Sequence, residues 1–229
     1  MSAKRLGRRE WLIPAGLILL SLVPVVAGAV RVVQLSVGVA VTPENARFVG
    51  DPAPVVVHIV AATLYCLLGA FQFVPSLRRR HPRWHRVAGR LLVPAGIAAA
   101  LAGVWMALFY PLLPIDGALL IGLRVSFGAA MAVSIVLGFV AILRRDLVRH
   151  RAWMIRGYAI GQGAGTQFLT HLPWLLVIGP PSELTRALLH AAGWLINIAV
   201  AEWIIHRSTA RRTPVPPRRS QPVVHAAPQ

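Results

Sequence analysis

Six long apolar segments separated by short polar breaks dominate this chain of 229 residues. The segments cover residues 11–33, 53–77, 87–110, 118–143, 153–178 and 184–205. A helix needs about 20 mostly apolar residues to cross a bilayer, and each segment meets that length. Short connections place consecutive helices side by side and antiparallel. The sequence therefore predicts an all-α integral membrane protein, a six-helix up-and-down transmembrane bundle.

The two ends of the chain differ in composition from this middle part. We expect a cytoplasmic N-terminal basic segment at 1–10, a six-span transmembrane domain at 11–206 and a disordered cytoplasmic tail at 207–229. The tail is rich in Pro, Arg and Ser. The basic start, the first apolar run and Ala27-Gly28-Ala29 also resemble a cleavable secretory signal. The apolar run of about 20 residues is longer than the usual 7–15, and this favours a retained span.

Overall composition excludes most soluble functions. Hydrophobic residues make up 56% of the chain, charged residues 14%, and the mean hydropathy is +0.65. A soluble domain carries about 25% charged residues, so a soluble enzyme is excluded. The single cysteine, Cys66, excludes a disulfide framework and a cysteine-based zinc site. The sequence identifies no catalytic residue and no metal site.

Basic residues predict the orientation of the bundle. The chain has 24 Lys and Arg against 7 Asp and Glu, a net charge of +17. Twenty of these basic residues fall on one side of the predicted bundle: Lys4, Arg5, Arg8, Arg9, Arg78, Arg79, Arg80, Arg83, Arg86, Arg90, Arg144, Arg145, Arg149, Arg151, Arg156, Arg207, Arg211, Arg212, Arg218 and Arg219. Positive residues mark the cytoplasmic side, which predicts a plasma-membrane protein with both termini cytoplasmic.

The same charge distribution indicates the partners. Besides the lipid bilayer itself, anionic lipid headgroups are expected against the basic face. Nucleic acid is excluded because no aromatic residues interleave with a basic groove. No protein partner can be named from the sequence.

Three histidines within the spans carry the main functional hypothesis. His58, His171 and His190 lie about five to seven residues from the outer ends of their spans, roughly 7–11 Å below the outer surface. Arg124 lies at a similar depth. Neutral imidazole ligates haem iron, and arginine pairs with propionates, so these residues predict a haem b site in the outer leaflet. The alternative is that the histidines only hydrogen-bond between helices.

A second histidine layer lies at the cytoplasmic side. His85-Arg86 opens the third span and His150-Arg151 opens the fifth, 65 residues further on. His85 and His150 are candidates for an inner haem pair or for a headgroup site. The alternative is interfacial anchoring, with Trp84 and Trp153 as belt residues.

Glycines spaced by four in the fifth span indicate either a close helix contact or a local interruption of the helix. Gly157, Gly161 and Gly165 would let another helix approach closely. The same glycines could also mark a locally unwound span of the kind that lines transporter sites.

Several motifs together resemble a known group of sequences. They are His58, Gly69, Gln72, Arg83-Trp84-His85-Arg86, Gly89-Arg90 and the HRAWMIR run at 150–156. They resemble an uncharacterised bacterial family of predicted multi-pass membrane proteins, a domain of unknown function, over about residues 55–205. The family implies this architecture and no activity. Many of its members carry an arginine late in the fifth span, where this sequence has residues 167–171 instead.

A looser similarity runs to the two-haem transmembrane cytochromes b, which implies haem b between two histidine layers. Four functions therefore remain open at this point. The first two are a haem b membrane redox protein and a small-solute transporter or channel. The others are a structural or assembly membrane protein with no catalytic role and a membrane enzyme that acts on lipid with His171 as base.

Overall fold

A computed structural model describes residues 10–210, nearly all of them helical. Five helices are long and apolar enough to cross a membrane: α2 (Leu12–Val37), α4 (Pro52–Ala70, continued by the 3-10 turn η1 at Phe71–Phe73), α6 (Pro82–Phe109), α7 (Ala118–Leu143) and α10 (Glu183–Ala210). The shorter helices are α3 (Ala46–Gly50), α5 (Pro75–Arg80), α8 (Leu147–Gly161) and α9 (Gly163–Val177). The all-helical membrane architecture is therefore confirmed.

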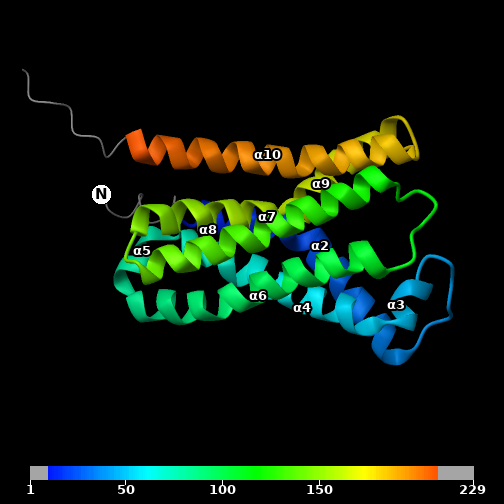
Figure 1. Ribbon diagram of the computed structural model, residues 1–229, viewed down its shortest axis with the longest axis horizontal. Coiled ribbons are helices and arrows are strands. Elements are labelled where there is room, and N and C mark those ends of the chain that lie inside the picture. Colours follow the sequence, from blue (N-terminus) through cyan, green and yellow to red (C-terminus); the bar gives the residue numbers. More distant parts are fainter. Residues whose placement is uncertain (1–9, 211–229) are drawn as a thin grey trace, which may run out of the picture.

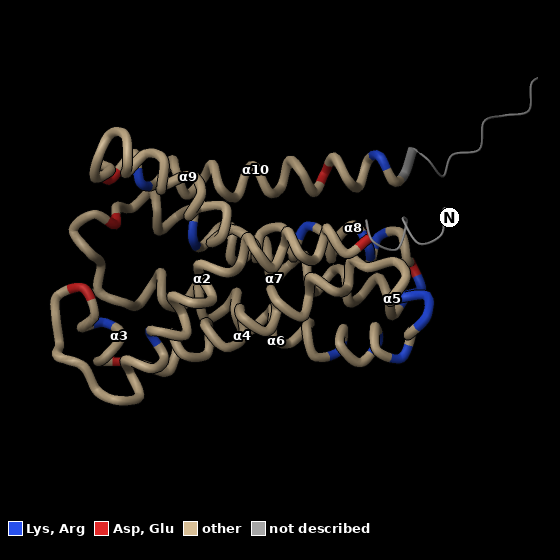
Figure 2. Tube along the Cα trace, turned by 180° about the vertical axis from the view of Figure 1, so that it is seen from behind, with Lys and Arg blue, Asp and Glu red and all other residues tan. Residues whose placement is uncertain are grey.

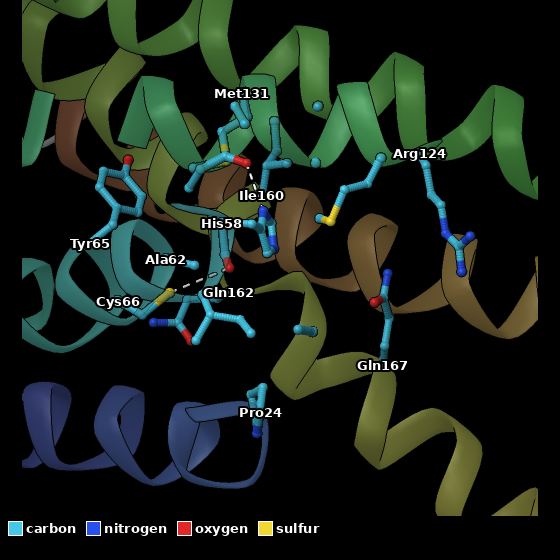
Figure 3. A pocket seen from close by; sticks show the side chains of 18 of the residues that line it. Pro24, His58, Ala62, Tyr65, Cys66, Arg124, Met131, Ile160, Gln162 and Gln167 are labelled. Carbon is cyan, nitrogen blue, oxygen red and sulfur yellow. Dashed lines mark hydrogen bonds between the residues drawn. The ribbon is translucent and has the colours of Figure 1, made fainter. Parts of the chain in front are cut away.

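The predicted fifth span is divided between α8 and α9, so six continuous spans are not confirmed. Each of these helices has 15 residues, about 22 Å at 1.5 Å per residue, and neither alone crosses a hydrocarbon core of about 30 Å. They follow each other along α10, and α9 leaves α8 at an angle (Figures 1 and 3).

The break lies at Gln162, between two glycines that weaken a helix. The N–H of Gly165 donates to the carbonyl of Gln162 at 3.1 Å, three residues back and not the usual four. The carbonyl of Gly161 accepts instead from the Cys66 thiol of α4, at 3.5 Å. Local unwinding, one of the two expectations for the glycines, is confirmed.

Other boundaries also differ from the prediction: α2 ends at Val37 and not at 33, and α8 begins at Leu147 and not at 153. The predicted second span ends early, because Pro75 starts the separate helix α5. Helix α6 begins five residues before the predicted 87. Helix α10 runs to Ala210, so the first four residues of the predicted tail are helical. The predicted segments 1–9 and 211–229 lie outside the described residues.

Consecutive helices pack side by side, as an up-and-down order requires (Figure 1). Helices α4, α6, α7 and α8 contact one another in sequence, α9 contacts α10, and α2 contacts both α4 and α9. Both ends of the described chain lie at the same end of the bundle as α5.

Most of the described Lys and Arg residues gather at that end (Figure 2). We call it the basic end; it includes the arginines of α5, of the start of α6 and of the connection from α7 into α8, namely Arg78, Arg79, Arg80, Arg83, Arg86, Arg144, Arg145 and Arg149. The opposite end, formed by α3 and by residues 38–45 and 110–117, is called the loop end. That the basic end faces the cytoplasm of a plasma membrane stays a prediction.

Packing is tight in the half of the bundle near the basic end. Tyr65, Leu92, Ile135 and Tyr158 are buried there in one cluster. The outside of the bundle is apolar instead, with exposed side chains such as Leu19, Val133 and Leu176. A water-exposed protein rarely shows so large an apolar surface, which fits a bilayer as the surrounding medium.

Helix α2 has an irregularity that α9 covers. Pro24 has no N–H, so the carbonyl of Leu20 lacks its normal helical donor. Gly165 of α9 lies directly against this carbonyl, and a Cβ at residue 165 would overlap it. The glycines of the fifth span thus also permit close helix approach, the other expectation for them, which is confirmed.

Candidate functional site

A cavity of about 420 Å³ lies between α2, α4, α6, α7, α9 and α10. It extends from Arg47 and Tyr110 at the loop end to Tyr65 and Gln162 in the middle of the bundle. Figure 3 shows side chains from several helices projecting into it. Its wall is mostly apolar with a few polar groups, the usual composition of a small-molecule site, and its size is in the usual range.

His58 lies on the α4 side of the cavity. Its Nδ1–H donates to the carbonyl of Ala99 at 2.8 Å, which assigns the proton to Nδ1 because a carbonyl only accepts. The ring fits against Gly103, where a Cβ would lie 3.3 Å from Cε1. Nε2 makes no hydrogen bond with any described residue, so it is free to bind a ligand.

His190 and His171 lie against each other between α10 and α9. Their rings meet edge to face with centroids 4.5 Å apart. Each Nδ1–H donates to the carbonyl four residues earlier, at 2.8 Å for His190 and 2.7 Å for His171. His190 lines the cavity with His58, whereas His171 lies behind it with a buried Nε2 that has no partner among the described residues.

This contact bears on the haem hypothesis. Two axial ligands bind on opposite faces of a porphyrin, and rings in edge contact leave no space for a porphyrin between them. His171 and His190 therefore do not fit as one axial pair in this arrangement, and His58 with His190 is the pair that shares a cavity. The assignment of haem ligands stays a prediction.

The inner histidines lie apart from the cavity wall. The Nδ1–H of His150 donates to the carbonyl of Gly138 at 2.8 Å. His85 lies near His150, and its Nδ1 is buried without a partner among the described residues. Neither histidine lines the cavity.

Three arginines converge on one carboxylate at the loop end. The Asp116 side chain is completely buried, with Arg47 at 3.4 Å, Arg124 at 3.3 Å and Arg186 at 3.1 Å. Burial alone would raise the pKa of Asp116, but the guanidinium groups of Arg124 and Arg186, with Arg47, outweigh it and hold that pKa below its ordinary value. Arg47 and Arg124 also line the cavity.

A hydrogen-bonded chain surrounds the helix break. Ser21 Oγ donates to Gln162 Oε1 at 2.9 Å, and Gln162 Nε2 donates to Tyr158 Oη at 2.8 Å. Tyr158 Oη in turn donates to the carbonyl of Cys66 at 2.6 Å. The chain links α2, α9, α8 and α4 at the deep end of the cavity.

Aromatic side chains close the cavity toward the basic end. Tyr158 packs between Tyr65 and Phe73, with ring centroids 5.6 and 4.9 Å apart. Gly69 and Gly161 provide the space, because a Cβ at either position would press on one of the tyrosine rings. The cavity therefore ends in the middle of the bundle.

Sequence reasoning found part of this site and missed the rest. His58, His190 and Arg124 were singled out and do line one cavity. The convergence on Asp116 and the roles of Gln162 and Tyr158 were missed. The signal for Gln162 was present, since a glutamine between two glycines in an apolar span is unusual. Asp116 looked like an ordinary interfacial acid.

Comparison with known proteins now places the chain in a family. A family model described as a predicted membrane protein, DUF2306, matches residues 55–205. The chain belongs to the DUF2306 family. The resemblance seen in the sequence is therefore confirmed. The match covers α6 to α9 completely, most of α4 and α10, and leaves out α2.

Neither the curated proteins nor the solved structures contain a match. The similarity to two-haem cytochromes b accordingly receives no support. Among residues 10–210, no three His, Cys, Asp or Glu side chains lie close enough to hold a metal ion together.

Proposed function

We propose that this protein binds a small solute in the cavity and carries it across the membrane. The observation that carries the proposal is the helix break at Gln162, which lies on the cavity wall. Broken helices line the substrate sites of many transporters, because their free backbone groups are tolerated only where they face a cavity or protein. A protein with only a packing role has no need of a cavity of this size.

The arrangement suggests how such a carrier would work. The solute enters from the loop end and rests on Gln162 and Tyr65, above the aromatic layer of Tyr65, Tyr158 and Phe73. Release at the basic end requires these rings to separate. Movement of α9 relative to α8 would do this, since Gln162 holds Tyr158 by a hydrogen bond.

Cys66 offers a direct test, because it is the only cysteine and lines the cavity. A small membrane-impermeant thiosulfonate is applied to one side or the other of sealed vesicles, and modification is read by mass spectrometry, with Cys66→Ala as the blank. In a carrier, Cys66 becomes accessible in turn from each side of the membrane. A transported solute should change the rates at which the reagent modifies Cys66 from the two sides. A cysteine that stays unreactive from both sides in the folded protein overturns the proposal.

A second candidate, a haem b redox protein, is favoured by the two free imidazole nitrogens on the cavity wall. His58 and His190 would ligate the iron and Arg124 would pair with a propionate, so that the haem supplies electron transfer. The purified protein should then show a Soret band and a sharp reduced α-band. His58→Ala and His190→Ala should remove them, while His206→Ala, at an exposed position, should not. A featureless visible spectrum after expression with ample haem rules this candidate out.

A further inference from the structure

The loop end of the cavity carries more positive charge than its own residues neutralise. Arg47, Arg124 and Arg186 surround the single carboxylate of Asp116, which leaves a formal excess of two positive charges. Among residues 10–210, no other acidic side chain lies within ion-pair distance of these arginines. Their side chains are only 17%, 28% and 25% exposed, so water hydrates them poorly.

Hydrogen-bond capacity shows the same imbalance. Each guanidinium has five N–H donors, while one carboxylate accepts about four hydrogen bonds. Arg47 and Arg124 share one oxygen of Asp116, each through a single nitrogen. The Nε of Arg47 is buried and has no hydrogen-bond partner among the described residues. The cluster therefore has spare donors in a weakly hydrated place, where an unpaired charge is costly.

Two of the three arginines belong to the cavity wall. Arg47 and Arg124 line it together with Gln167 and His190. Figure 3 shows Arg124 and Gln167 projecting into the same space from α7 and α9. Deeper in, Ala62, Ala100 and Met131 make the wall apolar. The cavity thus has a cationic end and an apolar body.

We infer that the ligand of this cavity is an organic oxyanion, a carboxylate or phosphate held by Arg47 and Arg124 with its apolar part in the chamber. The inference rests on the proposed function and names its substrate class. Arginine is well suited to this role, because its planar fork pairs with carboxylate and phosphate oxygens. Asp116 orients the arginines and leaves donors free for the ligand.

The test compares probes of matched shape and different charge. Protein in phosphatidylcholine nanodiscs is treated with methyl methanethiosulfonate, and the rate of Cys66 modification is measured with benzoate, phenyl phosphate, benzyl alcohol or benzylammonium present. The two anions should slow modification and raise Tm, while the alcohol and the cation should do neither. Equal protection by all four probes overturns the inference that the ligand is an anion. It does not contradict the proposal that the cavity binds a solute. Failure of the reagent to reach Cys66 without any probe overturns the proposed function itself.

Arginine variants test whether the cluster binds an anion or only stabilises the fold. Arg47→Gln and Arg124→Gln should weaken anion protection about 10- to 100-fold, the effect of losing a charge-assisted hydrogen bond. Arg186→Gln, which touches Asp116 but does not line the cavity, should retain it, as should Arg31→Gln, which lies over Phe48. Loss of binding in Arg186→Gln equal to that in Arg124→Gln would overturn the assignment.

Two sources of oxyanion are distinguished by the lipid. If an anionic lipid headgroup is the ligand, nanodiscs of phosphatidylglycerol alone should protect Cys66, and Arg124→Gln should remove that protection. If a free organic anion is the ligand, phosphatidylglycerol should have no effect while benzoate or phenyl phosphate protects. Absence of protection by every anion, lipid or free, refutes the inference.

Discussion

The two halves of this bundle share α2, α4, α6, α7 and α10, but α8 lies in one half and α9 in the other. Near the basic end, Gly96 and Gly161 let Tyr65 and Ile135 fill the centre completely. Near the loop end, α9 has left the line of α8, and a cavity with a cationic end takes the place of the core. The comparison shows that a packed core and a cavity lie on opposite sides of one short helix break.

The largest effect is expected where α2 and α9 meet. Gly165→Ala should destabilise the fold by at least about 3 kcal/mol, because its Cβ would overlap the backbone carbonyl of Leu20 and a whole helix must move. Gly122→Ala is the matched control, since nothing lies within 4 Å of that position. Unfolding measured by steric trapping or by Tm in detergent checks both. Equal stability of the two variants would contradict this packing.

The loop end should be the half that is sensitive to acid. Asp116→Asn leaves three guanidinium groups unbalanced, so we expect a loss of about 2 to 3 kcal/mol near pH 7. Because the folded pKa of Asp116 lies below its ordinary 3.8, the carboxylate stabilises the fold above that pH and the contribution disappears as pH falls through the folded pKa. The stability difference between wild type and variant should therefore shrink only below about pH 4. A difference that is already lost near pH 6 would contradict the assignment.

Two tyrosines in the packed half should respond in opposite ways. Tyr158→Phe leaves Gln162 Nε2 without its acceptor and removes the second hydrogen bond to the Cys66 carbonyl, and should cost about 1 to 2 kcal/mol. Tyr65→Phe removes a buried hydroxyl that has no hydrogen-bond partner among the described residues, and should be neutral or stabilising. Thermal unfolding of both variants in one detergent measures the difference. The reverse order would show that the chain of bonds around Gln162 is misassigned.

The smallest effect is expected in the half of the bundle near the basic end. Arg156 pairs with both oxygens of Glu202, at 2.6 and 2.9 Å, but the two side chains are partly exposed. Arg156→Gln should lower the free energy of unfolding by about 1 kcal/mol or less. Arg149→Gln should have almost no effect, because the ion pair of Arg149 with Asp146 is more exposed to solvent. A loss at Arg156 as large as that at Asp116 would remove the contrast between the two ends.

Hydropathy predicted most of the membrane-spanning helices but not the contacts that form the cavity. The predicted span 118–143 coincides with α7, because a long apolar run has only one way to satisfy its backbone in lipid. The same reasoning cannot detect the break at Gln162. Hydropathy averaged over about 20 residues carries no information on which N–H group donates to which carbonyl. The depth of the histidines was predictable, but the contact of His171 with His190 depends on helix rotation. The ion pairs of Asp116 could not be predicted, because they depend on how the connecting segment places this residue against arginines from three helices.

The carbonyl of Leu20 has a consequence for how the protein is made. Helix α2 leaves the ribosome about 140 residues before Gly165, the residue that covers this carbonyl. Until then α2 sits in lipid with a backbone acceptor that Pro24 has left without its donor, an arrangement that hydrocarbon penalises. The first helix to be inserted should therefore be among the last to dock, and the bundle would close only when α9 reaches the membrane.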